Sequence, residues 1–208
     1  MPSRWFVTSV DKKVGMALSG MVLYGFLVGH LMGNLLLLKG DAGTSFNAYS
    51  AYLAGHPLLI PVELLLLACF LLHAYLGALV SLENRRARPV DYVVHKAVGG
   101  RNWANRTMIY SGILIGVFLV LHLKTFKYAD RQGGTLYDLV LRTFRQPLYV
   151  AWYVAAMVIL GFHLWHSLQS AFQTLGIGGP RIRPLGLLVG VILSAGFGFL
   201  PAFIYAAK

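Results

Sequence analysis

Five long apolar stretches constrain the fold of this 208-residue chain more than any other feature. They lie at roughly 14–38, 58–82, 105–127, 147–175 and 184–206. About 20 helical residues cross a bilayer core of about 30 Å, so each stretch is long enough to span a membrane. The stretches lack the alternation of strands, which favours helices over a barrel. The sequence therefore predicts an all-α integral membrane protein, with 1–208 forming one five-helix transmembrane bundle.

The composition agrees with the membrane class and excludes several functions. Only 12% of the residues are charged and the mean hydropathy is +0.66, which would make a soluble domain hard to keep in solution. One hydrophobic unit of this size leaves no room for a soluble catalytic domain, and the sequence has no glycine-rich nucleotide-binding motif. The first stretch is too long for a signal peptide, so we expect it to be part of the structure.

The basic residues predict an orientation in the membrane. The net charge is +11, but the basic residues lie in the connections, where we expect them to contact lipid headgroups and not nucleic acid. The N-terminal tail and the connections after the second and fourth spans carry eleven Lys and Arg residues, against seven on the opposite side. The positive-inside rule then predicts a multi-pass protein of the cytoplasmic membrane, with its N-terminus in the cytoplasm and its C-terminus outside.

One histidine lies about sixteen residues into each of the first four spans: His30, His73, His122 and His163. A lone histidine in a span is usually a hydrogen-bonded packing residue, but four at matched positions favour a shared function. Neutral imidazole ligates haem iron, so four histidines can hold two haems. The sole cysteine is Cys69 and no C-x-x-C-H motif is present, so such haems would be non-covalent, of the b type.

The depths of these histidines predict how they pair. With a rise of about 1.5 Å per residue, His30 and His122 lie roughly 24–26 Å above the inner boundary of the membrane. His73 and His163 lie roughly 22–24 Å below the outer boundary. We therefore expect His30 and His122 to ligate an outer haem, and His73 and His163 to ligate an inner one. A vertical separation on the order of 15 Å would make two stacked haems a relay across the membrane.

Several segments resemble one known family when they are taken together and in order. They are KVGMALSG (13–20), HLMGNLLL (30–37), FNAYSAYL (46–53) with HPLL (56–59), NRRARPVDY (84–92) and FHLWHSLQSAFQTLG (162–176). With the four histidines, they resemble the cytochrome b subunit of succinate:quinone oxidoreductases and fumarate reductases, in its single-anchor, five-helix, di-haem form (the b558 family). The resemblance covers nearly the whole chain. It implies haem ligands on the first four helices, paired one with three and two with four.

The resemblance also implies partners and a role. A flavoprotein subunit would oxidise succinate, and an iron–sulfur subunit would pass the electrons on. This chain would anchor both on the cytoplasmic side and exchange electrons with quinone, for which menaquinone is the usual choice in the family. It would have no succinate-oxidising site and no catalytic residue of its own. The type and site of the quinone, the direction of the reaction and any homo-oligomer of the complex are left open by the sequence.

Three basic side chains near the ligands are candidates for contacts with the haems. His166 lies one turn beyond His163, but the family pattern of a histidine followed four residues later by a small residue fits His163 and Ser167. His166 is therefore expected to contact the haem or a propionate without ligating the iron. Arg85 and Lys124 are candidates for propionate contacts, although the positive-inside rule and snorkelling to the interface also explain them.

Two further polar residues are candidates for a quinone or proton site near the outer haem. Glu63 is the only carboxylate well inside a predicted span, where it would exchange protons with a quinol. A helix N-terminus within reach of headgroup water would also favour a carboxylate there. Asn34 follows His30 by one turn, so its amide would reach a propionate or a quinone carbonyl, or bond to a neighbouring helix.

Two other functions are consistent with five apolar spans. A di-haem b subunit of a different dehydrogenase, such as a hydrogenase or a formate dehydrogenase, would also carry paired histidines. One histidine on each of four successive helices and the NRRARP segment argue against that assignment. A cofactor-free transport or assembly protein would show repeats or broken helices around a midplane site, and we find no convincing internal repeat.

Overall fold

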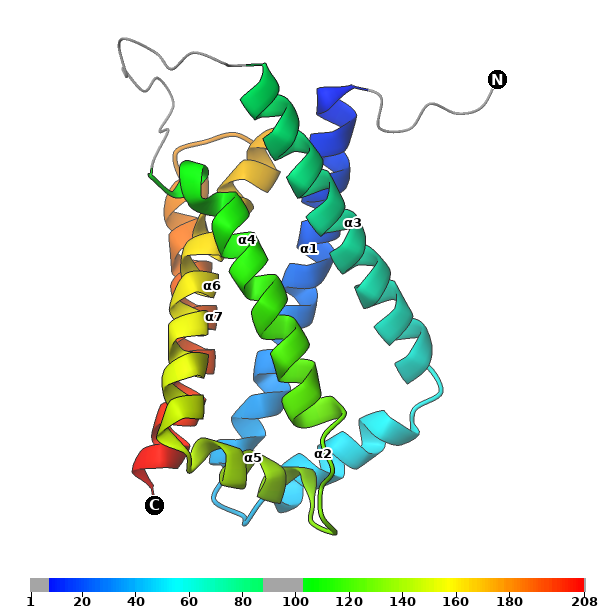
Figure 1. The fold of residues 1–208 in the computed structure, drawn as a ribbon, viewed down its shortest axis with the longest axis vertical. Coiled ribbons are helices and arrows are strands. Elements are labelled where there is room, and N and C mark those ends of the chain that lie inside the picture. The colour runs from blue at the N-terminus through cyan, green and yellow to red at the C-terminus, as the bar shows by residue number, and fades with distance from the viewer. Residues whose placement is uncertain (1–7, 88–102, 208) are drawn as a thin grey trace.

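The computed structural model describes residues 8–87 and 103–207, and in these ranges every regular element is helical. In chain order (Figure 1), the elements are α1 (Ser9–Asn34) with the 3₁₀ turn η1 (Leu35–Leu38), α2 (Thr44–Gly55), α3 (Leu59–Arg86), α4 (Trp103–His122) with the π turn η2 (Leu123–Lys127), α5 (Leu136–Phe144), α6 (Pro147–Thr174) and α7 (Ile182–Ala206). Five are long and apolar enough to cross a membrane. The predicted all-α, five-span bundle is confirmed.

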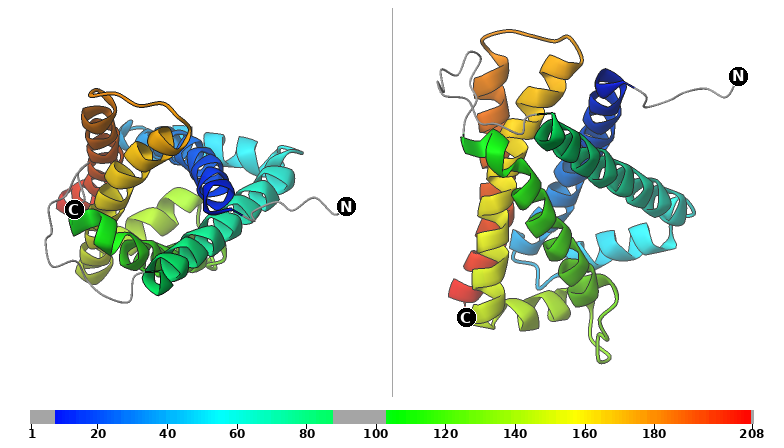
Figure 2. Two further views of the ribbon diagram at one scale, coloured as in Figure 1. Left: turned by 90° about the horizontal axis from the view of Figure 1, so that it is seen from above. Right: turned by 45° about the horizontal axis from the view of Figure 1, so that its top comes forward.

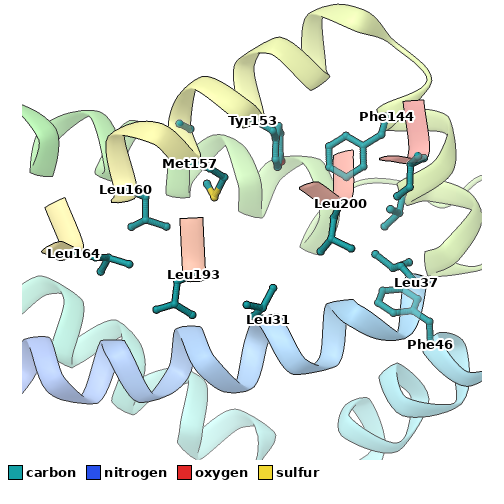
Figure 3. Close-up of a cluster of buried hydrophobic side chains, with 13 residues drawn as sticks. Leu31, Leu37, Phe46, Phe144, Tyr153, Met157, Leu160, Leu164, Leu193 and Leu200 are labelled. Carbon is teal, nitrogen blue, oxygen red and sulfur yellow. The ribbon is translucent and has the colours of Figure 1, made fainter. Parts of the chain in front are cut away.

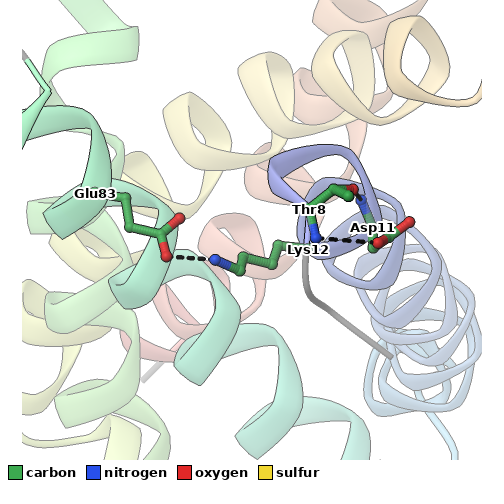
Figure 4. Close-up of polar contacts among 4 residues, drawn as sticks. All are labelled: Thr8, Asp11, Lys12 and Glu83. Atoms are coloured by element: carbon green, nitrogen blue, oxygen red, sulfur yellow. Dashed lines mark hydrogen bonds and ion pairs between the residues drawn. The ribbon is translucent and has the colours of Figure 1, made fainter. Parts of the chain in front are cut away.

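The spans agree with the predicted stretches to within a few residues, and the differences have local causes. α1 begins at Ser9 instead of 14 because Thr8 and Asp11 form a capping box ahead of the apolar run (Figure 4). In it, the Asp11 N–H donates to Thr8 Oγ over 3.1 Å, and the Thr8 N–H donates to the Asp11 carboxylate over 3.2 Å. α3 continues through a charged last turn to Arg86 instead of ending at 82.

Two short helices, α2 and α5, lie in the connections at one end of the bundle and run across its long axis (Figure 1). The Tyr137 N–H at the start of α5 donates to Asn47 Oδ1 of α2 over 3.2 Å. Thr135 caps α5, and its hydroxyl bond to Asp138 holds the pKa of that carboxyl below its usual value. These two helices cover the end of the bundle at which α1 ends and α6 begins.

The core lies mainly between α1, α6 and α7, and it extends to α2 and α5 (Figure 3). α3 contributes only Leu76 and Val80 to the buried residues, and none of the α4 side chains that the structure describes is buried. Seen from above, α3 lies on the side of the bundle away from α7 (Figure 2). Two of the four helices that carry the candidate histidines therefore contribute little to the buried core, although α3 packs along α1 and α4 along α6.

α6 and α7 pack closely because small residues face each other along their seam. A Cβ atom added to Gly186 would lie 2.9 Å from the Trp165 carbonyl oxygen, and one added to Gly190 would lie 3.1 Å from the Trp165 nitrogen. Ser194 faces Gly161 in the same seam. Because the opposing atoms belong to the backbone, the two helices must separate to admit a larger residue.

Gly186→Ala is therefore expected to lower the melting temperature of the detergent-solubilised protein. Overpacking costs about 1–3 kcal/mol, which corresponds to a fall of roughly 2–12 °C for a chain of this size. Thermal unfolding followed by circular dichroism measures the shift. Gly25→Ala in α1 is the matched control, because a Cβ atom there has no neighbour within 4 Å. Equal melting temperatures for the two variants would contradict the close α6–α7 contact.

Candidate functional site

The structure brings the four histidines of the first four spans together as two pairs. His30 of α1 faces His122 at the end of α4, with ring centroids 5.8 Å apart and ring planes at 89°. His73 of α3 faces His163 of α6, with centroids 6.5 Å apart and planes at 70°. All four residues are half-buried. These are the two pairs that the depth argument predicts, and we keep the names of that prediction: His30 and His122 are the outer pair, and His73 and His163 are the inner pair.

The spacing of each pair fits two imidazoles on opposite sides of one iron atom. Two Fe–N bonds of about 2 Å, plus about 1 Å from each nitrogen to its ring centre, place the centroids about 6 Å apart. Across residues 8–87 and 103–207, no cluster of three or more His, Cys, Asp or Glu side chains is placed to hold a metal ion. Haem iron takes its other four ligands from the porphyrin. Two histidines are therefore enough to complete its coordination.

The two pairs are stacked along the bundle. A Cβ atom added to Gly20 of α1 would lie 3.0 Å from Cε1 of His73, so Gly20 marks the level of the inner pair. His30, in the outer pair, follows ten residues later on the same helix, which is about 15 Å of helical rise. Similar spacings separate the two levels on α4 (Ser111 and His122) and on α6 (Tyr153 and His163).

Three of the four rings are held at Nδ1 by partners that the sequence did not reveal. Nδ1 of His73 lies 3.0 Å from the Met16 carbonyl oxygen, Nδ1 of His163 lies 3.0 Å from Ser111 Oγ, and Nδ1 of His122 lies 3.3 Å from the Tyr153 hydroxyl. A metal-bound histidine normally donates its second ring N–H in this way. Each of these bonds leaves Nε2 as the nitrogen available to a metal.

Aromatic side chains surround the outer pair. The ring of His30 stacks on Phe26 and also contacts Phe197 of α7, with centroids 5.3 and 5.7 Å away. The ring of His122 contacts Phe118 and Phe126 at 5.6 and 5.4 Å. α7 has no histidine, yet it closes one side of the outer pair through Phe197. An apolar, aromatic environment of this kind excludes water from the imidazoles.

The two carboxylates of α3 form ion pairs at opposite ends of the helix. Glu63 pairs with Lys127 of η2, and both side chains are more than a third exposed. Glu63 thus lies at the surface of the bundle, and its charge has a partner. At the other end, Glu83 pairs with Lys12 of α1 (Figure 4). The sequence did not predict either ion pair, because neither lysine is close to its partner in the chain.

The remaining candidates lie outside the two pairs. The Asn34 side-chain amide donates to the His30 backbone carbonyl over 2.7 Å, which is a bond within α1 instead of one to another helix. Arg85 donates to the Tyr110 hydroxyl over 3.3 Å and lies over its ring, and both side chains are exposed. Lys124 is exposed in η2.

His166 lies one turn beyond His163 on α6 and does not belong to either histidine pair. It is 6% exposed, and its ring lies against that of Trp165, with centroids 4.5 Å apart. Among the residues that the structure describes, its buried Nε2 atom has no hydrogen-bond partner. The structure places His163, and not His166, opposite His73.

No family model, curated protein or solved structure matches this chain. The class of protein therefore follows from the structure: an all-α, multi-pass membrane protein. Within the part of the chain that the structure describes, its distinguishing feature is two stacked pairs of facing histidines.

Proposed function

We propose that this chain is a membrane-embedded di-haem b cytochrome. His30 and His122 would hold the outer haem, and His73 and His163 the inner one. The observation that carries the proposal is the facing of these rings at 5.8 and 6.5 Å, in two pairs about 15 Å apart along the bundle. When bound, the haems supply one-electron redox chemistry at two depths in the membrane.

The residues of the chain would bind, orient and shield these groups. The Nδ1 partners would fix the orientation of the rings, and the phenyl rings of Phe26, Phe118 and Phe197 would exclude water from the outer site. Arg85, Lys124 and His166 remain candidates for contacts with the edges and propionates of the haems. Glu63 and Asn34 remain candidates for a quinone or proton site near the outer pair.

We further propose that the cytochrome is the membrane anchor of a succinate:quinone oxidoreductase or fumarate reductase. It would carry electrons between an iron–sulfur subunit and membrane quinone, with menaquinone as the expected quinone. The support is the ordered set of sequence segments that resemble this family, together with the five spans. The iron–sulfur and flavoprotein subunits would dock at the end of the bundle where α1 begins, which the basic residues assign to the cytoplasm.

The test of the cytochrome proposal is a haem count on the purified chain from a haem-replete host. We expect two b haems per chain in the pyridine haemochrome assay, and a reduced-minus-oxidised spectrum typical of low-spin b haem. A chain without haem would overturn the proposal and favour a transport or assembly role. The anchor proposal has its own test, because succinate should reduce the haems only when the flavoprotein and iron–sulfur subunits co-purify with the chain.

A further inference from the structure

The hydrogen bonds at the inner pair determine where the imidazole protons lie. A carbonyl oxygen has no proton to give, so His73 must donate its Nδ1 proton to Met16. The direction of the hydrogen bond between Ser111 and His163 is less obvious, because a hydroxyl can either donate or accept. The Ser111 Oγ atom lies 3.0 Å from the Met108 carbonyl oxygen, to which it donates its only proton. When Nε2 of His163 binds iron, its Nδ1 carries the proton, so Ser111 accepts from Nδ1 and donates to Met108.

The surface of α4 around Ser111 is shaped to receive this ring. Gly112 follows Ser111, and a Cβ atom added to it would lie 3.6 Å from Cε1 of His163. Two small residues in succession let the imidazole approach the helix, so that its Nδ1 reaches a hydroxyl tied to the backbone. Ser111 is itself half-buried, which limits the competition of water for this bond.

From this geometry we infer that Ser111 is a positioning residue of the inner haem site. Its oxygen accepts a hydrogen bond from the Nδ1–H of His163, which fixes the tautomer that presents Nε2 and makes the imidazole a stronger electron donor. The inference rests on the proposed haem ligation by His163. It assigns a redox role to a serine that the sequence does not distinguish from any other polar residue in a span.

Loss of the Ser111 acceptor is expected to raise the midpoint potential of the inner haem. Without it, His163 becomes a weaker donor to iron, which destabilises the ferric state relative to the ferrous state. Outer hydrogen-bond partners of metal ligands typically contribute 10–100-fold to metal affinity or activity. We expect Ser111→Ala to shift the ferrous/ferric ratio of the inner haem about tenfold towards ferrous, which is a rise of about 59 mV in its one-electron midpoint potential.

The experiment is a redox titration of the two haems in the full chain, followed optically. In Ser111→Ala one midpoint should rise and the other should stay unchanged. Ser111→Thr keeps a hydroxyl that can bond both the helix carbonyl and the imidazole, so it should retain both wild-type midpoints. Ser194→Ala is the matched control, because its hydroxyl donates to the Val191 carbonyl of its own helix and packs against Gly161 instead of a histidine.

The outcomes of the titration test the role of Ser111 separately from the di-haem proposal. A shift of one midpoint, or the loss of one haem, in Ser111→Ala but not in Ser111→Thr or Ser194→Ala supports the inference. If Ser111→Ala does not fold, Ser111→Cys provides a weaker acceptor of similar size and should show the same shift. Two unchanged midpoints would overturn the role of Ser111 and leave the di-haem proposal intact. A wild-type chain without haem would overturn both.

Discussion

His163→Ala is expected to leave one b haem per chain, whereas His166→Ala, one helical turn away, should leave two. His163 faces His73 at 6.5 Å, so its removal leaves the inner haem with a single axial ligand. His166 is packed against Trp165 and is not paired with His73. This comparison is sharp because both variants delete the same imidazole from the same helix, and only the position differs.

The measurement is the ratio of haem to protein for the two purified variants, with the absorption spectrum of the reduced haem. The remaining haem in His163→Ala should keep the low-spin spectrum of the bis-histidine outer site. The reverse pattern, with a haem lost in His166→Ala only, would show that the two histidines exchange roles. Two haems in both variants would mean that neither residue is an essential ligand.

Gly20→Leu is expected to displace His73 and release the inner haem without altering any ligand. A Cβ atom at this position would already lie 3.0 Å from Cε1 and 3.2 Å from Nδ1 of His73. The rest of a leucine side chain needs space close to the imidazole, and it also obstructs the approach of Nδ1 to the Met16 carbonyl. We expect about one haem per chain, with the spectrum of the outer site retained.

Gly25→Leu is the matched control for this substitution. Gly25 lies on the same helix, and a Cβ atom there has no neighbour within 4 Å. Both variants gain the same helix propensity, about 1 kcal/mol relative to glycine, so a difference between them reports the contact with His73 alone. If Gly20→Leu binds two haems, the ring of His73 does not lie against α1 as the structure places it.

Hydropathy predicted the five spans well because membrane-spanning helices must satisfy all of their backbone hydrogen bonds within long apolar runs. It did not predict α2 and α5, because helices of 12 and 9 residues are too short to cross a membrane and polar residues interrupt their apolar ones. Their position depends on contacts distant in the chain. One example is the ring of Tyr137, which lies so close to Gly43 that this residue, with its φ of +81°, has no room for a side chain.

Counting residues along each span predicted which histidines lie at the same depth, because the helical rise is constant. It could not predict which direction each side chain faces. That direction depends on how the helices rotate against one another, and it determines that Ser111 and Tyr153 contact the imidazoles. The same limit applies to Glu63, whose ion pair with Lys127 joins two different spans. The orientation of the bundle and its partners stay predictions.

The π turn η2 begins directly after His122, and its signature bond runs from the Tyr128 N–H to the Leu123 carbonyl over 3.0 Å. A π turn is an α-helix with one residue inserted, and each residue turns the helix by about 100°. Because the extra residue follows the histidine, it rotates Lys127 relative to α4 without changing the direction of the imidazole. The same turn also sets the position of Phe126, whose ring contacts His122 at 5.4 Å, so a change of length in this connection would alter the surroundings of the outer pair as well as the ion pair to α3.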